Sequence, residues 1–148
     1  MLSDSENVAR VIFSPRMIYQ GVLQPEAFRL RGNIAEEYLS VLRTVIPTWR
    51  DDVLSIPQRK NRQLYGYAEM SVKDIRNASF QDVSFDVAAC NNLVMKSHAG
   101  IFITVGGEQL IGGKQLETIA SETAQNHLLL LIQRRLVEIA RKRLIVTV

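Results

Sequence analysis

Nucleophilic or acid–base chemistry would depend on very few residues of this 148-residue chain, which has two histidines and one cysteine. His98 stands beside Ser97, just before a run of strand-forming residues, where an imidazole could act as acid, base or anion donor near neutral pH. A structural or merely exposed histidine is the alternative. Cys90 could act as a nucleophile with either histidine as its base, although a bystander cysteine is the commoner outcome. His127 falls on an apolar helical stripe, which is typical of a structural histidine, so His98 is the candidate catalytic residue.

Phosphate binding is suggested by the glycine pair Gly112-Gly113, which is followed by Lys114. The phosphate-binding loop of nucleotide hydrolases requires another glycine five residues before its Gly-Lys, and Glu108 occupies that position here. Gln115 also replaces the Ser or Thr that would hold magnesium. A weaker hypothesis remains, because the amides at the start of a following helix could bind an anion. A plain hairpin exit and helix start is the alternative.

The sequence predicts no metal site and no cofactor, with a carboxylate-rich site assembled in space as the alternative. Two histidines and one cysteine cannot form the usual Cys/His zinc sets, and neither His-x-x-x-His nor Cys-x-x-Cys spacing occurs.

A lone cysteine gives no sign of an oxidising compartment, and the acidic, polar amino terminus does not resemble a signal peptide. The longest strongly apolar run, residues 128–132, is far shorter than the roughly 20 residues that cross a bilayer. We therefore expect a cytoplasmic protein without a membrane partner.

Composition and length predict one ordinary globular domain covering residues 1–148. Hydrophobic residues make up 47% of the chain and charged residues 22%, which is close to the average for globular proteins. A chain of this size can bury a core that needs no disulfide or metal. The formal net charge is only +3, so the distribution of the arginines and lysines matters more than their total.

The first three quarters of the chain read mainly as strands separated by turns. Alternating or β-branched residues predict strands over the ranges 27–31, 38–43, 64–70 and 83–87, and a short strand or helical turn over 8–13, where Arg10 interrupts an apolar patch. Residues 47–57 lie between two prolines and predict a short helix, and residues 58–62 form a basic loop. Ser71 is expected to cap a helical turn over residues 72–76, and Glu36 and Glu37 to be solvated edge residues.

A β-hairpin is predicted over residues 101–111. Residues 101–105 are β-branched or aromatic, and Gly106-Gly107 can adopt the positive φ angles that a two-residue type I′ turn requires. Residues 109–111 would form the returning strand. His98 would lie just before the first strand of this hairpin.

Everything after Gly113 is expected to be helical, as one long helix or two helices joined near Asn126. One apolar stripe consists of residues 116, 119, 120, 123, 127, 130, 131, 134 and 137, and a second of residues 128, 132, 136, 139 and 140. Two overlapping stripes indicate burial against more than one surface. A basic cluster, residues 134, 135 and 141–143, lies near the carboxyl end of the helical region. The apolar end, residues 144–148, would add an edge strand or pack against another subunit.

These elements predict an α+β fold. Strands precede the helical end, and the early segments lack the helices that parallel crossovers need. The expected architecture is a largely antiparallel sheet from the first three quarters of the chain, covered by one long or two consecutive C-terminal helices.

Three short segments resemble a pattern found in uncharacterised bacterial small domains. They are Leu-Ser-Val-Leu-Arg at residues 39–43, the segment 65–72 running into Ile-Arg at 75–76, and Ser-His-Ala-Gly-Ile at 97–101. The pattern spans about the first two thirds of the chain and implies no activity. It makes Arg43, Arg76 and His98 a trio to test as one polar cluster. Three unrelated surface residues are the alternative.

Two functional hypotheses follow. The favoured one is a non-catalytic protein-interaction or oligomerisation module, which would use the carboxyl helix and an apolar surface made of Leu144, Ile145, Val146 and Val148. The alternative is a phosphate-directed enzyme or binder acting on a nucleotide or RNA, with His98 as acid or base and with Arg43 and Arg76 holding phosphate. Gly112 and Gly113 would be further anion-binding positions in that case.

Overall fold

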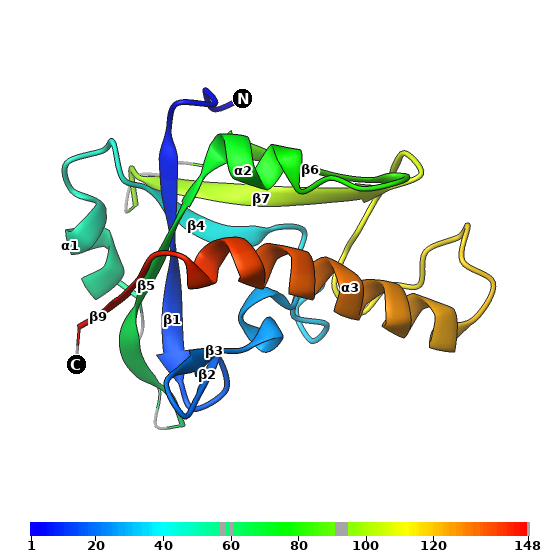
Figure 1. Ribbon diagram of the computed structural model, residues 1–148, viewed down its shortest axis with the longest axis horizontal. Coiled ribbons are helices and arrows are strands. Elements are labelled where there is room, and N and C mark those ends of the chain that lie inside the picture. Colours follow the sequence, from blue (N-terminus) through cyan, green and yellow to red (C-terminus); the bar gives the residue numbers. More distant parts are fainter. Residues whose placement is uncertain (57–58, 60, 91–94, 148) are drawn as a thin grey trace.

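Strand β1 (Asn7–Ser14) runs through the middle of a seven-stranded sheet in the computed structural model, which describes residues 1–56, 59, 61–90 and 95–147 (Figure 1). All strand pairs of this sheet are antiparallel. Across the sheet the strands follow the order β6 (Val83–Ala89), β7 (His98–Val105), β4 (Leu39–Arg43), β1, β5 (Gln63–Ser71) and β9 (Leu144–Val146), with β8 (Glu108–Gln109) pairing with β7. The remaining elements are the ribbon of β2 (Ile18–Tyr19) and β3 (Val22–Leu23), the 3-10 helix η1 (Pro25–Phe28), and the helices α1 (Trp49–Leu54), α2 (Val72–Asn77) and α3 (Glu122–Arg141). The predicted α+β fold is confirmed.

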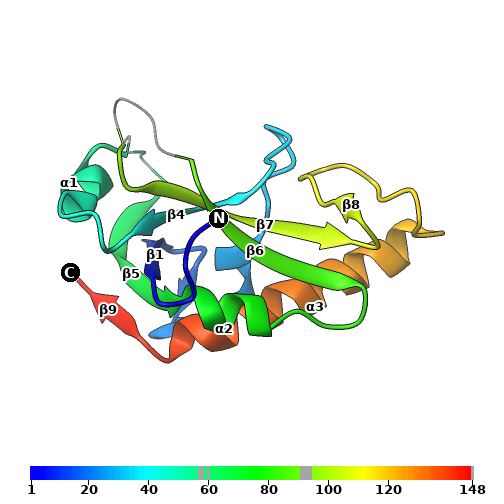
Figure 2. The same ribbon diagram turned by 90° about the horizontal axis from the view of Figure 1, so that it is seen from above.

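Two hydrophobic clusters cover opposite faces of β1, because side chains alternate along a strand. Val8 and Ile12 face the main core, which α2 and α3 cover on one side of the sheet (Figure 2). Ala9 and Val11 face a smaller outer cluster on the α1 side. The outer cluster consists of Ala9, Val11, Leu42, Trp49, Val53 and Tyr67, with Phe13, Ile56, Leu64 and Met95 packed against it.

β1 and β4 pair over a short distance and then diverge. Their register comprises Val8 with Arg43 and Ala9 with Leu42, whereas β1 stays paired with β5 as far as Ser14. The register with β5 shifts between Ile12 and Phe13, and such an irregularity bends a strand. In Figure 1, β1 accordingly runs away from β4 at a steep angle. An opening forms between the two strands from Arg10 onward.

The described residues after Gly113 contain one helix, and it begins later than predicted. Helix α3 starts at Glu122, where the Ser121 hydroxyl caps it by accepting from the Ala124 amide at 3.1 Å. Residues 116, 119 and 120 precede the helix, so their assignment to a helical stripe is wrong. Gln125 explains the extended loop: its side chain accepts from the Leu116 amide at 2.6 Å and donates to the Lys114 carbonyl at 2.8 Å. These bonds give the loop backbone partners that helical turns would otherwise supply.

The second apolar stripe is the one that faces the core. Ile132, Leu136 and Ala140 are buried, with Leu128 and Ile139 packed against the core beside them. The first stripe is largely wrong, because its members Thr123, His127, Leu130, Leu131 and Arg134 are exposed and only Val137 among its helical members is buried. None of the described helices is long and apolar enough to cross a membrane.

Several local predictions are confirmed, and two are wrong. The predicted hairpin forms, with φ angles of 58° at Gly106 and 83° at Gly107. Its returning strand is shorter than predicted and consists of Glu108–Gln109. His98 was expected to lie just before the first strand, but it is the first residue of β7. The Ser71 hydroxyl caps α2 by accepting from the Asp74 amide at 2.9 Å. The predicted strand over residues 27–31 is wrong: Pro25 opens the turn η1, which buries the consecutive residues Ala27 and Phe28 together instead of alternating them. The carboxyl end does add an edge strand, β9.

Candidate anion-binding site

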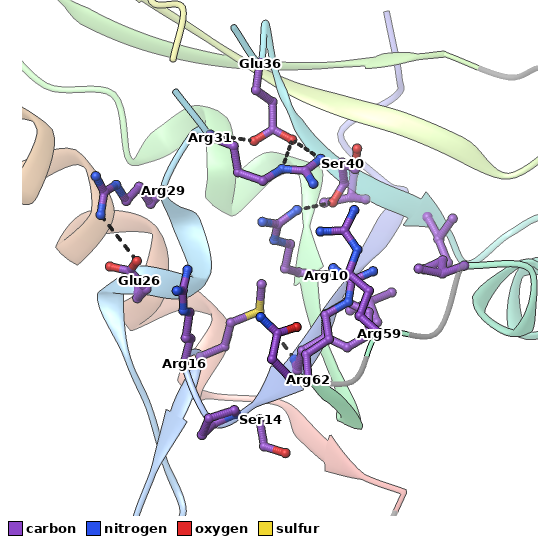
Figure 3. A pocket seen from close by; sticks show the side chains of 18 of the residues that line it. Arg10, Ser14, Arg16, Glu26, Arg29, Arg31, Glu36, Ser40, Arg59 and Arg62 are labelled. Atoms are coloured by element: carbon purple, nitrogen blue, oxygen red, sulfur yellow. Dashed lines mark hydrogen bonds and ion pairs between the residues drawn. The ribbon is translucent and has the colours of Figure 1, made fainter. Parts of the chain in front are cut away.

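A pocket of about 680 Å³ occupies the opening between β1 and β4 (Figure 3). Residues of β1, from Arg10 to Ser14, and of β4, from Ser40 to Leu42, form its floor. Its walls come from the segments 15–17 and 26–36, and from Ile56, Arg59, Asn61, Arg62, Met95 and His98. Lys60 and the pair 57–58 in this stretch lie outside the described residues.

Arginine dominates the charge of this pocket. Six arginines line it, namely Arg10, Arg16, Arg29, Arg31, Arg59 and Arg62, together with the two glutamates Glu26 and Glu36. The pocket therefore carries an excess of four positive charges, whereas the whole chain carries a net charge of +3. Figure 3 shows these arginine side chains, from separate segments, around one hollow. The positive charge of the protein is thus concentrated at this site.

Arg10 is the buried cation of the pocket, with 9% of its surface exposed. Its Nε donates to the Ala27 carbonyl at 2.9 Å and its Nη1 to the Ser40 carbonyl at 2.7 Å. Burial lowers the pKa of Arg10 to about 10, against the opposing attraction of Glu36, so the guanidinium stays charged at pH 7. None of the hydrogen bonds that Arg10 makes to described residues uses Nη2. The structure therefore holds a desolvated cation between two carbonyls, with its Nη2 left to donate to a ligand.

Two other arginines of the pocket are already neutralised by carboxylates. Glu36 accepts from the Arg31 side chain at 2.9 and 3.2 Å and from the Arg31 backbone amide at 3.0 Å. Only 10% of the Glu36 side chain is exposed, so its prediction as a solvated edge residue is wrong. Arg29 and Glu26 form a weaker, exposed pair at 3.4 Å. The cationic part of the pocket consequently contains Arg10, Arg16 and Arg59.

Arg16, Arg59 and Arg62 bring charge to the mouth of the pocket. Arg16 and Arg59 are exposed, and neither forms an ion pair with a carboxylate of the described residues. The Arg62 guanidinium lies 4.1 Å from the centroid of the Phe13 ring, which is a cation–π contact. Burial lowers the pKa of Arg62, and the neighbouring Arg59 and Arg31 add to that effect. Like charges held close together in this way favour the binding of an anion.

His98 lines the same pocket. Its Nε2 lies 3.2 Å from the Ser40 hydroxyl, and its ring packs 5.8 Å from the ring of Tyr38. Burial lowers the pKa of His98, in part opposed by a hydrogen bond with the Cys90 backbone. A pKa below the usual value of a free histidine makes the imidazole neutral at pH 7.

Neither a Cys90 nucleophile nor a His127 base gains support from the structure. The Cys90 thiol donates to the Ala88 carbonyl at 3.7 Å, and burial raises its pKa, so it is protonated at pH 7. The contacts between Cys90 and His98 use the Cys90 backbone: its amide donates to the His98 carbonyl at 2.8 Å, and the His98 ring also forms a hydrogen bond with it. His127 lies on the exposed side of α3.

The predicted trio does not share one pocket, because Arg43 and Arg76 hold the amino-terminal segment instead. Arg43 forms a bidentate pair with Glu6 at 2.9 and 3.0 Å. Arg76 donates to Asp86 at 2.8 Å, to Asp4 at 2.7 Å and to the Leu2 carbonyl at 2.5 Å. The bonds to Asp4 and Asp86 raise the pKa of Arg76. Of the trio, only His98 is among the residues that line the arginine pocket.

Gly112 and Gly113 allow two loops to approach closely. A Cβ on Gly112 would lie 2.3 Å from the Arg31 carbonyl oxygen, and Gly113 has a φ of 76° beside Gly32. Residues 114–121 separate these glycines from α3, so the premise that they lead into a helix start is wrong. Anion binding at Gly112 and Gly113 stays a prediction without a helix to support it. Their contact with the Arg31 segment does help to fix one wall of the arginine pocket.

The basic segments of the sequence divide between the pocket and the fold. Arg59 and Arg62 of the predicted basic loop line the pocket, as does Asn61. Of the carboxyl-terminal cluster, Arg135 donates to the Ala78 carbonyl and Arg141 to the Leu23 carbonyl, while Arg143 pairs with Glu69. These three arginines attach α3 and β9 to the sheet and its connections.

Sequence reasoning missed the arginines that converge. The available signal was Arg10, a charge in the middle of the apolar run 8–13 that had to be buried with partners. Among the described residues, no three side chains of His, Cys, Asp or Glu come together in a way that could hold a metal ion. No family model matches this chain, and no curated protein and no solved structure matches it either. The geometry of the pocket is therefore the basis for assigning a function.

Proposed function

We propose that this protein binds a phosphate-bearing ligand with several negative charges in the arginine pocket. The observation that carries the proposal is the excess of four positive charges around one cavity of about 680 Å³. A cluster of this kind is costly to keep in a folded protein unless an anion compensates for it, because the cations repel one another. Its concave shape and its volume are in the range typical of small-molecule sites.

Phosphate fits these arginines better than a single carboxylate does. A guanidinium presents a planar fork of donors that matches the oxygens of a phosphate or a carboxylate. One carboxylate would neutralise only one of the four excess charges, whereas a di- or triphosphate brings enough charge to balance most of them. Arg10 contributes most in this account, because its two carbonyl partners fix it before the ligand arrives and its burial strengthens its attraction to an anion.

Isothermal titration calorimetry with inorganic tripolyphosphate tests the proposal on the full chain. Arg59 is exposed, so its substitution has little effect on folding, and Arg59→Glu is expected to weaken binding about tenfold or more. Arg134→Glu is the matched control, because it makes the same change of charge at an exposed position of α3 outside the pocket. It is expected to change the affinity by about twofold at most, since salt screens distant charges. Absence of tripolyphosphate binding at low salt, or equal effects of the two variants, would contradict the proposal.

The interaction-module hypothesis stays a prediction. Ile145 and Val146 are exposed on the edge strand β9, with 49% of Val146 accessible, and Val148 lies outside the described residues. Leu144 instead packs partly against the main core. Light scattering coupled to size exclusion, on the full chain and on a chain ending at Arg143, checks this hypothesis. If both are monomers and neither retains a protein partner, the hypothesis fails.

A further inference from the structure

The arginine pocket also has an apolar wall. Val11 and Leu42 of the outer cluster line the pocket, as do Phe13, Ile56 and Met95, which pack against that cluster. The pocket is therefore divided into a cationic part around Arg10 and Arg59 and an apolar part at the edge of the outer cluster. An inorganic phosphate chain would fill only the cationic part.

The polar side chains of His98 and Asn61 line the same pocket. His98 reaches the pocket beside Leu42, with which it pairs across β4 and β7, and Asn61 reaches it from the segment that carries Arg59 and Arg62. A neutral imidazole and an amide can each donate and accept a hydrogen bond. The His98 ring already bonds the Ser40 hydroxyl and the Cys90 backbone. A purely hydrocarbon group against this wall would cover the Asn61 amide without offering it a partner, which costs free energy.

We propose that the ligand is a nucleoside di- or triphosphate, with its phosphates among Arg10, Arg16 and Arg59 and its base against the wall formed by Leu42, Ile56 and Met95. This inference rests on the proposed phosphate binding and adds the organic part of the ligand. A nucleobase combines a flat apolar surface with a polar edge, which matches an apolar wall in a pocket that the Asn61 amide also lines. The cavity volume of about 680 Å³ is suited to a ligand of that size.

The test compares nucleotides with a phosphate chain that has no base. Calorimetry on the full chain is carried out with ATP, GTP, CTP and UTP, with inorganic tripolyphosphate, and with geranyl diphosphate as a diphosphate on a hydrocarbon body. At least one nucleotide is expected to bind about tenfold more tightly than tripolyphosphate. The double variant Ile56→Ala, Met95→Ala should remove most of that advantage while it leaves the tripolyphosphate affinity within about twofold.

Leu54→Ala is the matched control, because Leu54 is an exposed apolar residue of the neighbouring helix α1 that does not line the pocket. This variant should keep the nucleotide advantage. Ile56 and Met95 are only partly buried, so their substitution is compatible with folding, which circular dichroism checks.

The outcomes separate this inference from the proposed function. Tripolyphosphate binding without a nucleotide advantage overturns the nucleoside inference and leaves phosphate binding in place. Tighter binding of geranyl diphosphate than of every nucleotide also overturns it, in favour of a hydrocarbon body. If neither tripolyphosphate nor a nucleotide binds, both proposals fail.

Discussion

The Nη1 of Arg10 donates to the carbonyl oxygen of Ser40 at 2.7 Å, across the opening where β1 and β4 no longer pair. A side chain thus makes the connection that a backbone amide would make in a continuous sheet. The same guanidinium donates from Nε to the Ala27 carbonyl, so it also joins η1 to the sheet. The residue that stabilises this irregularity is also the buried cation of the pocket. Its role in the fold and its proposed role in binding can therefore be measured together.

Arg10→Lys is expected to destabilise the protein and to weaken tripolyphosphate binding. An ammonium group cannot reproduce the planar arrangement that reaches both carbonyls, and an unsatisfied buried acceptor costs about 1–3 kcal/mol. Urea denaturation measures the free energy of unfolding, and calorimetry measures the affinity. Arg134→Lys, at an exposed position of α3, should change the free energy of unfolding by less than about 0.5 kcal/mol. Unchanged stability of Arg10→Lys would show that the two carbonyl bonds contribute little.

Neither Arg43→Gln nor Arg76→Gln is expected to change the tripolyphosphate affinity by more than about twofold. Both guanidinium groups form ion pairs with carboxylates outside the pocket. Arg76→Gln should instead loosen the amino terminus, since Arg76 links Leu2 and Asp4 to Asp86. Limited proteolysis near residues 2–6 detects that change. A tenfold loss of affinity in either variant would restore the trio that the sequence pattern suggested.

The sequence predicted the strands of this fold better than it predicted the site. Local patterns such as the alternation over residues 83–87 and the Gly106-Gly107 turn carry enough information to specify a strand and a reversal. The site depends instead on where β1 leaves β4, which no local pattern encodes. Arg10 and Arg59 are 49 positions apart in the chain and line one pocket only because the strands diverge. Arg43 and Arg76 resembled site residues because a charge next to an apolar strand has the same appearance whether its partner is a ligand or a carboxylate.

The stability of the protein is expected to fall as His98 becomes protonated. Burial lowers the pKa of His98 in the folded state, so the unfolded chain binds more protons between that pKa and about 6.5. Stability therefore rises with pH through this window, and the cost of protonating His98 is fully present below the folded-state pKa. Urea denaturation from pH 7.5 downward should show a smaller loss for His98→Gln than for the native chain. His127→Gln, at an exposed position, serves as the control and should keep the native dependence of stability on pH. If the free energy of unfolding changes with pH in the same way for the native chain and for His98→Gln, the prediction is refuted.

Ser97→Ala is expected to destabilise the link between α1 and β7. Buried Asp52 on α1 accepts from the Ser97 amide at 3.1 Å and also from the Ser97 hydroxyl. Removal of the hydroxyl leaves part of a buried carboxylate without a donor, which costs about 1–3 kcal/mol. Chemical denaturation measures this loss. Ser84→Ala on β6, where the hydroxyl is exposed, serves as the control and should change stability by less than about 0.5 kcal/mol. Equal effects of the two substitutions would mean that the Asp52 contact is not important.

Gly66→Ala is expected to detach β9 from the edge of the sheet. A Cβ at position 66 would lie 2.0 Å from the carbonyl oxygen of Ile145, so the β9 backbone must move. Overpacking of this kind costs about 1–3 kcal/mol. The Thr147 amide, which donates to the Tyr65 carbonyl at 2.9 Å, should then exchange with solvent at least about tenfold faster. A chain ending at Arg143 should show the same stability as Gly66→Ala if loss of β9 is the whole effect. If β9 mediates self-association, Gly66→Ala and the chain ending at Arg143 should both be unable to self-associate. A native exchange rate of the Thr147 amide in Gly66→Ala would show that β9 accommodates the methyl group and would contradict the prediction.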